Sequence, residues 1–447
     1  MSGPGALAAT EACLAAIERH NGLINAMLTV DAPGAREAAR AADRAALDGR
    51  WLGLLHGLPV AVKDNIDTAG LRTTSGSLFF QDNVPNQDAT VVRRLRRAGA
   101  VLIGKANMQE LAFGIRSTNP LAGPCRNPWD PDRVPGGSSG GSGAAVIADM
   151  CAAALGSDTG GSIRLPASMT GVAGLRPTHG RVPNTGSTPV SPAHDTIGPL
   201  ARRVADVARL FAVIAGHDPA DPVSAARPLE NFLPSLDDGI AGVRIGLPRS
   251  FYFDDADAGV AELVMAAARV LEARGAELVD VDLAEAAEMQ AWASVMIFAD
   301  ACAVNAERLD RGREWFDGQV YDRMITGRDY SAVDYSRALA AKASWKARLG
   351  RLFGDIDILL SPTVPSLVPP VEEDRSLLEA TRDATRNTYC GAFGELPGLS
   401  LPCGFTADGL PAGLQLEAAW WREPLLLRAG VAYQAATDWH LARPPLD

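Results

Sequence analysis

Long apolar runs and clustered cysteines are both missing from this sequence. No segment approaches the ~18 consecutive apolar residues that cross a bilayer, and the first residues lack the basic and apolar segments of a secretion signal. The cysteines form no C-x-x-C pair and lie at no metal-ligand spacing from a histidine. They are Cys13, Cys125, Cys151, Cys302, Cys390 and Cys403. We therefore expect reduced, mostly buried thiols, no metal, no membrane partner and a cytoplasmic location.

Basic residues are in the minority. The chain has 42 Lys and Arg against 53 Asp and Glu, which gives a formal net charge of −11. This balance argues against a nucleic-acid surface as the main function, although it leaves a local basic patch open. We expect no nucleic-acid partner, and a monomer or homodimer. The 447 residues, 47% of them hydrophobic, are enough to bury a large core.

Short apolar runs alternate with helical patterns along most of the chain, which predicts an α/β fold. Helices are predicted over 6–20, 35–48, 90–98, 202–215, 256–274 and within 284–350. Strands are predicted over 58–62, 101–104, 243–247, 277–281, 356–360, 399–401 and 413–416. Gly216 and Gly275 are expected to end two of the helices. Residues 217–240 are predicted to form a linker or a surface loop.

Two glycine–serine segments are the most informative motifs. The first is Gly136-Gly137-Ser138-Ser139-Gly140-Gly141-Ser142-Gly143, and the second ends in Thr159-Gly160-Gly161-Ser162. Glycine allows backbone N–H groups to approach a reacting atom closely. Two such turns that each present a serine indicate an acyl-transfer site. Ser142 is expected to belong to the start of a helix.

Three other functions of these motifs are disfavoured. A phosphate-binding loop needs Gly-Lys-Ser/Thr, but no lysine occurs between Lys105 and Lys342. A nucleophile elbow should follow a buried strand, whereas three prolines precede Ser138 within ten residues. Asp158-Thr159-Gly160 is similar to an aspartic-protease motif, but that chemistry needs a second such carboxylate.

The remaining alternative is a pair of serines with Lys63 as base. A lysine can act as a base only when neutral, so its pKa must fall about three units from ~10.4. Lys63 follows the apolar run Val60-Ala61-Val62, where burial would have this effect. Considered alone, Lys63 fits better with a lysine whose ammonium group reaches solvent from a strand end.

Taken together, these residues resemble the amidase signature family of serine hydrolases. The resemblance rests on Gly57–Asp64, Gly136–Gly143, Gly156–Arg164 and Gly174–Gly180, with further segments at Leu359–Thr363 and Gly413–Leu416. It implies an α/β fold with a central mixed β-sheet covered by helices on both faces. It also implies one large domain over 1–447. Within it we expect an N-terminal helical segment (1–50), a catalytic core (52–216), a more variable region (217–350) and C-terminal strands and helices (351–447).

The resemblance also implies roles for individual residues. Ser162 is at the nucleophile position, Ser138, whose peptide bond is cis in relatives, is at the bridging position, and Lys63 is at the base position. The backbone N–H groups of Thr159, Gly160, Gly161 and Ser162 would hold the oxyanion. Ser139, Asp158 and Arg164 would support the loop. No cofactor is implied.

The loop after Gly180 decides which type of member we expect. Residues 181–199 look more like stand-alone amidases than like the A subunits of tRNA-dependent amidotransferases. We therefore expect a stand-alone hydrolase of small-molecule amides (aryl, arylacetyl or aliphatic), with anilides, esters and carbamates as further substrates. The alternatives are the A subunit of a glutamyl-tRNA(Gln) or aspartyl-tRNA(Asn) amidotransferase, and a non-catalytic binding protein. Candidate substrate contacts are Gly136, Gly137, Phe113, Gly114, Ile115, Trp292 and Met296. At helical spacing, residues such as the last two more often belong to the core.

Overall fold

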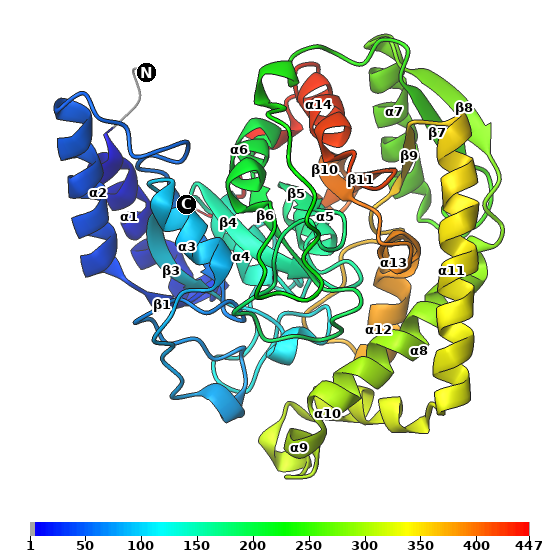
Figure 1. Cartoon of the computed structure of the whole chain (residues 1–447), viewed down its shortest axis with the longest axis horizontal. Coiled ribbons are helices and arrows are strands. Elements are labelled where there is room, and N and C mark those ends of the chain that lie inside the picture. The colour runs from blue at the N-terminus through cyan, green and yellow to red at the C-terminus, as the bar shows by residue number, and fades with distance from the viewer. Residues whose placement is uncertain (1–4, 447) are drawn as a thin grey trace.

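One mixed sheet of eleven strands runs through residues 5–446, which the computed structural model describes (Figure 1). Its strand order is β1-β3-β2-β4-β6-β5-β10-β11-β9-β7-β8. The strands are β1 (Met27–Val30), β2 (Pro59–Lys63), β3 (Val101–Ala106), β4 (Ala153–Asp158), β5 (Ala173–Arg176), β6 (Thr196–Ala201), β7 (Arg244–Pro248), β8 (Glu277–Val281), β9 (Ile358–Pro362), β10 (Gly398–Phe405) and β11 (Pro411–Ala418). The predicted mixed α/β architecture is confirmed.

Parallel pairing between β2 and β4 positions the site. Val60 pairs with Ala153 and Val62 with Leu155, so both strands end at the same edge of the sheet. Lys63, the last residue of β2, therefore lies beside the end of β4 and the turn that follows Asp158. The carboxyl ends of parallel strands are where open α/β sheets commonly bind ligands.

Helices cover both faces of the sheet, because neighbouring strand residues point in opposite directions. Val60 and Val62 pack in one apolar cluster with α3, α6, α7 and α14, whereas Ala61 packs in another with α1, α2 and α4. The helices are α1 (Ala6–Ile24), α2 (Ala32–Leu47), α3 (Thr90–Arg97), α4 (Gly140–Ile147), α5 (Arg164–Thr170), α6 (Val204–Ile214), α7 (Ala258–Ala273), α8 (Ala286–Val304), α9 (Ala306–Leu309), α10 (Gly318–Ile325), α11 (Ala332–Asp355), α12 (Leu377–Ala384), α13 (Arg386–Phe393) and α14 (Glu423–Gln434).

A third apolar cluster lies among the helices of the second half of the chain. It joins α8, α10, α11, α12 and α13 to β9, and in Figure 1 these helices stand together beside the sheet. Capping boxes at Ser331 and Ser376 begin α11 and α12, each serine accepting the N–H of the residue three positions on. The helical prediction for 284–350 is confirmed, divided into α8 to α11.

Helix ends agree with the glycine signals to within a few residues. The helix α6 ends at Ile214, and Gly216 follows with φ +117°. After α7, Gly275 adopts φ +97°, a conformation that glycine adopts more readily than other residues. The segment 217–240 holds only a short 3-10 turn at Leu233–Ser235.

The six cysteines are free and buried. Within residues 5–446, no helix is long and apolar enough to cross a membrane.

Removing a large core side chain tests this packing. Phe211 on α6 is fully buried in the cluster that covers β2 and β4, with its ring 5.7 Å from that of Phe232. We expect Phe211→Ala to lower the free energy of unfolding by about 3–5 kcal/mol. Thermal and urea denaturation would measure the change. In Trp51→Ala, which removes a 59% exposed aromatic ring, stability should change by less than about 0.5 kcal/mol; equal losses in the two variants would contradict this account of the core.

Candidate active site

Lys63 lies fully buried at the end of β2 with its ammonium group directed at two serines. Its Nζ donates to Ser138 Oγ at 2.6 Å and to Ser157 Oγ at 2.9 Å. No carboxylate of the described residues comes within ion-pair distance of this nitrogen. The structure thus brings the predicted base and the predicted bridging serine into contact.

The environment of Lys63 favours its neutral form. Burial lowers the pKa of Lys63 to about 7, while the more distant charges of Asp158 and Asp195 act in the opposite direction. A group with this pKa is part neutral at physiological pH and can accept a proton. The alternative in which the ammonium group reaches solvent is excluded by the burial of Lys63.

Ser138 and Ser139 lie where the first glycine–serine loop contacts the second. The Gly137–Ser138 peptide bond is cis, as the resemblance implies. Ser139 donates its backbone N–H to the carbonyl of Ser162 at 3.2 Å and its hydroxyl to the carbonyl of Ser157 at 3.1 Å. Ser142 lies in α4 and donates to the carbonyl of Leu155, a structural position as expected.

Ser162 is the partly exposed member of the group. Its hydroxyl makes no hydrogen bond to any of the described residues, so the link from Ser138 to Ser162 is not closed in this conformation. Hydrogen bonds between catalytic groups are often long without substrate and shorten when it binds. An open hydroxyl beside a cavity is also the one that a substrate can reach.

The turn at 159–162 presents backbone donors beside that hydroxyl. Gly161 donates its N–H to Asp158 Oδ1 at 2.7 Å, so it is not available to a substrate. Among the described residues, the N–H groups of Thr159, Gly160 and Ser162 have no acceptor. The structure therefore leaves three of the four predicted oxyanion donors free. A Cβ on Gly160 would lie 2.2 Å from the ring of Tyr389, which requires glycine at this position.

Asp158 holds this turn through a buried ion-pair network. Its carboxylate pairs with Arg164 at 3.1 Å and with Arg176 at 3.0 Å, and all three side chains are fully buried. Burial alone would raise the pKa of Asp158, but the two guanidinium groups outweigh it and hold the pKa well below its usual range. Arg164 continues to Glu417 at 3.2 Å and to Gln415 at 2.8 Å, both on β11. Asp158 and Arg164 thus connect the end of β4 to α5 and β11, and their supporting role in catalysis stays a prediction.

Sequence reasoning missed three members of this arrangement. The hydroxyl of Ser157 accepts a hydrogen bond from Lys63. Its position next to Asp158, inside the second glycine–serine segment, could have identified it from the sequence. Arg176 completes the ion-pair network from β5. Asp195 accepts the hydroxyl of Thr159 at 2.6 Å, and burial raises its pKa to about 6. Arg176 lies inside the segment Gly174–Gly180 that carries the resemblance, but nothing in that segment indicates its ion pair with Asp158. Asp195 lies at no motif spacing that identifies it.

A small cavity opens at Ser162. Phe113, Gly114 and Ile115 line it, as do Thr159 and Gly160. Of the other predicted substrate contacts, Gly136 and Gly137 are buried in the loop, and Trp292 and Met296 lie in the apolar cluster of the helices. None of these four lines this cavity or its neighbour.

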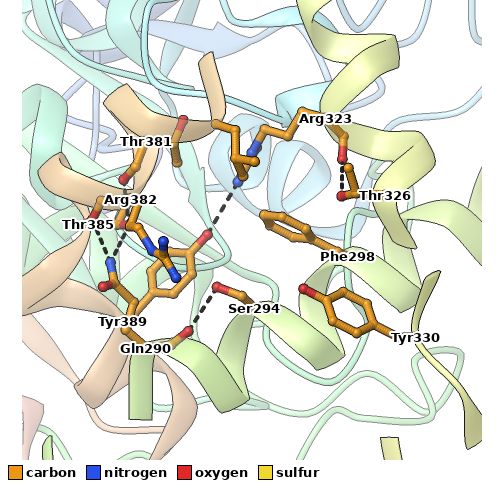
Figure 2. Close-up of a pocket in the computed structure, with 11 residues that line it drawn as sticks. Gln290, Ser294, Phe298, Arg323, Thr326, Tyr330, Thr381, Arg382, Thr385 and Tyr389 are labelled. Carbon is orange, nitrogen blue, oxygen red and sulfur yellow. Dashed lines mark hydrogen bonds between the residues drawn. The ribbon is translucent and has the colours of Figure 1, made fainter. Parts of the chain in front are cut away.

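The neighbouring cavity has a volume of about 170 Å³ (Figure 2). It shares Arg323, Thr381, Thr385 and Tyr389 with the first, so the two adjoin. The helix α8 contributes Gln290, Ser294 and Phe298, which lie four residues apart on one helix face. Trp292 and Met296 lie two residues from these positions and face elsewhere, which explains their absence from the cavity.

Arg323 is a buried cation in the wall between the two cavities. Its guanidinium group lies 3.9 Å from the ring centre of Phe113 and 4.7 Å from that of Phe298, and Nη2 contacts the Tyr389 hydroxyl at 3.4 Å. Its Nε has no hydrogen-bond partner, and no carboxylate of the described residues forms an ion pair with it. Burial lowers the pKa of Arg323. An anionic group in the cavity would compensate this charge.

No three His, Cys, Asp or Glu side chains within residues 5–446 are grouped so that they could hold a metal ion.

Comparisons with a family model, with curated proteins and with solved structures all identify the same protein family. The curated relatives also belong to one type of enzyme within it. The Amidase family model matches residues 8–427. The A subunit of the glutamyl-tRNA(Gln) amidotransferase of Chloroflexus aurantiacus is 40% identical over 461 aligned residues, which cover 98% of this chain and 94% of the relative. The solved structure of the corresponding protein of Thermotoga maritima superposes with a TM-score of 0.85 at 30% identity, covering 99% of this chain and 95% of that one. A structure of a vestigial protein complex that reveals the evolutionary origins of an s-triazine catabolic enzyme gives a TM-score of 0.92 at 36% identity, covering 97% and 95%.

These relatives overturn two expectations. The expectation of a stand-alone hydrolase is wrong, because curated relatives about 40% identical over nearly the whole chain are amidotransferase A subunits. The expectation that a small-molecule amide is the sole partner, with no nucleic acid, is wrong on the same ground. The first error comes from giving the loop at 181–199 more weight than the rest of the chain, and the second comes from the net charge of −11. Loops vary more among relatives than the elements they connect, so one loop is weak evidence for type.

The evidence for the family extends over nearly the whole chain, because the family model covers residues 8–427 and the curated relative from Chloroflexus aurantiacus aligns over 98% of the chain. Lys63, the two serine loops and the sheet that carries them agree with this assignment. The chain belongs to the amidase family.

Proposed function

We propose that this protein is the amide-cleaving A subunit of a tRNA-dependent amidotransferase of the glutamyl-tRNA(Gln) type. The observation that carries the proposal is the 40% identity to such a protein over 98% of the chain. In this role the site releases the nitrogen of a donor amide, and the rest of the complex transfers that nitrogen to the glutamyl group on tRNA.

The reaction begins with proton transfer toward Lys63. Neutral Lys63 takes the hydroxyl proton of Ser138 while Ser138 takes that of Ser162, and Ser162 Oγ forms a bond to the amide carbon. The 2.6 Å contact between Lys63 and Ser138 supports the first link. Substrate binding brings the hydroxyls of Ser138 and Ser162 into the second hydrogen bond of the relay.

Charge then develops on the carbonyl oxygen. The free N–H groups of Thr159, Gly160 and Ser162 face this oxygen, and each such donor contributes about 3–4 kcal/mol of transition-state stabilisation. Because the Asp158 network fixes the turn before substrate arrives, little reorganisation is needed.

The nitrogen cannot leave as an anion. Lys63 returns the proton through Ser138 to the nitrogen, the C–N bond breaks, and ammonia leaves an acyl group on Ser162. Water attacks the acyl group with the same relay accepting its proton, which releases the carboxylic acid and restores the serine.

Arg323 supports a donor that carries a carboxylate. The cavity is apolar on the Phe113 and Phe298 side, and its buried guanidinium group has no carboxylate partner among the described residues. An amino-acid amide such as glutamine places a primary amide and a carboxylate a few bonds apart. Ser162 and Arg323 line the same cavity, and we propose that such a donor binds there with its amide at Ser162 and its carboxylate at Arg323.

Activity of the complex tests the proposal most directly. We expect ammonia transfer to glutamyl-tRNA, followed by acid-gel or mass analysis of the aminoacyl group, only when this chain is combined with its partner subunits. The isolated chain should release ammonia from glutamine slowly or not at all. Rapid hydrolysis of anilides or carbamates by the chain alone, without acceleration by partners and charged tRNA, would contradict the amidotransferase assignment.

Serine substitutions test the relay. Ser162→Ala should lower kcat for glutamine hydrolysis on the order of 10⁴-fold or more. Ser138→Ala should leave weak residual activity, a loss on the order of 10²–10⁴-fold. Ser142→Ala is the matched control, since this buried serine belongs to the same run but donates only to Leu155; it should keep its turnover. Wild-type rates in Ser162→Ala would rule out an acyl-enzyme on this residue.

The pKa of Lys63 predicts a pH dependence. The active form is the neutral amine, and burial lowers its pKa to about 7. Therefore kcat/KM for the donor amide should rise about tenfold per pH unit below about pH 7 and level off above it. A pH profile of the assembled enzyme, paired with that of Lys63→Ala, checks this; a rise that persists unchanged in Lys63→Ala would assign the titration to another group.

A further inference from the structure

A third cavity lies apart from the site at Ser162. Its volume is about 340 Å³, and it shares no lining residue with the two cavities described above. Its walls include Arg181, Arg227, Arg422, Arg428 and Trp421, which together we call the arginine pocket. The start of α14 and the loop at 227–230 form its sides.

An aromatic ring holds two of these guanidinium groups close together. The Cζ of Arg181 lies 4.6 Å from the ring centre of Trp421, and that of Arg227 lies 5.4 Å from it. Such stacking orients a guanidinium group without using its N–H donors. Trp421 itself adopts φ +71°, a strained conformation for a bulky residue.

The positive charges of the pocket are mostly uncompensated. Arg181 is partly compensated, since it lies 3.7 Å from Glu423 and its Nη1 donates to the carbonyls of Arg227 and Pro228, while its Nε is buried without a hydrogen-bond partner among the described residues. The guanidinium groups of Arg227, Arg422 and Arg428 form no ion pair or hydrogen bond with any of the described residues; Arg422 is near enough to Asp357 to lower the pKa of that carboxyl group without contacting it. Arg428 Nε is also buried without a partner among them. Within residues 5–446, Glu230 is the one carboxylate that lines the pocket.

We propose that the arginine pocket binds a phosphate group of a phosphorylated ligand. Three unpaired guanidinium groups present more donors than the two oxygens of a carboxylate accept, whereas a phosphate offers several acceptor oxygens to the planar donor forks of arginine. The phosphate belongs either to an RNA strand or to a free nucleotide or pyrophosphate. The proposal that the pocket binds phosphate rests on the guanidinium groups alone. Only the assignment of that phosphate to RNA rests on the proposed amidotransferase function.

Binding measurements on the full chain test the proposal. The probes are fluorescently labelled uncharged tRNA, followed by anisotropy, and ATP and pyrophosphate, followed by calorimetry. We expect the double variant Arg227→Gln/Arg428→Gln to bind at least one probe at least about 10-fold more weakly than wild type, because it loses two charge-assisted hydrogen-bonding groups. In the tRNA arm the salt dependence should also become less steep.

The double variant Arg269→Gln/Arg351→Gln is the matched control. It removes two exposed arginines from α7 and α11, so its net charge changes equally, and its affinities should stay within about twofold of wild type. A selective loss of tRNA binding assigns the phosphate to RNA, and a selective loss of ATP or pyrophosphate binding assigns it to a free ligand. No binding by wild type, or equal loss in both double variants, overturns the proposal.

The outcome is separable from that of the proposed function. If the arginine-dependent binding is present but the assembled complex transfers no ammonia to glutamyl-tRNA, the amidotransferase assignment fails and the pocket stands. If transfer proceeds and the pocket variants bind every probe like wild type, the pocket assignment fails alone.

Discussion

The buried carboxylate of Asp158 is the contact on which the site geometry depends. It receives the N–H of Gly161 and the guanidinium groups of Arg164 and Arg176, so one side chain fixes the end of β4, the start of α5 and the end of β5. Through Arg164 the same network reaches β11, more than 200 residues away in the sequence. Removing one member of such a network leaves an uncompensated buried charge, which typically costs about 3–5 kcal/mol. The conformation of the turn that carries Ser162 therefore depends on the ion pairs of Asp158 with Arg164 and Arg176.

The same carboxylate also adjusts the base from a distance. Burial alone would make Lys63 a much weaker proton acceptor, and the charges of Asp158 and Asp195 partly oppose that effect, which leaves its pKa at about 7. A direct ion pair would instead keep the lysine charged. The separation between Lys63 and these carboxylates thus matters as much as their presence, and the direct hydrogen-bond partners of the Lys63 ammonium group are the hydroxyls of Ser138 and Ser157.

Much of the fold and the centre of the site could be predicted from the sequence, because both depend on local patterns. Short continuous apolar runs mark strands such as β2, whose residues are all buried. The glycines and serines of the two loops occur together in short motifs that can be recognised from the sequence alone. Arg176, Asp195 and Arg323 could not be found in this way, since each acquires its role only when distant elements pack together. Helical spacing likewise could not separate cavity from core on α8, where Ser294 faces the cavity and Met296, two residues on, is buried.

Net charge misled the interpretation of partners for a related reason. A total of −11 is an average over the whole chain, whereas a ligand responds to charges within about 8 Å, the Debye length at physiological ionic strength. Within that range, the guanidinium groups of Arg181 and Arg227 lie 4.6 and 5.4 Å from the Trp421 ring, because the folding of α14 against the loop after Gly180 gathers arginines from three separate segments. The segments carrying Arg181, Arg227 and Arg428 are each unremarkable in sequence. An acidic protein can therefore present a strongly basic pocket, and composition alone excludes a basic surface only where the fold does not concentrate one.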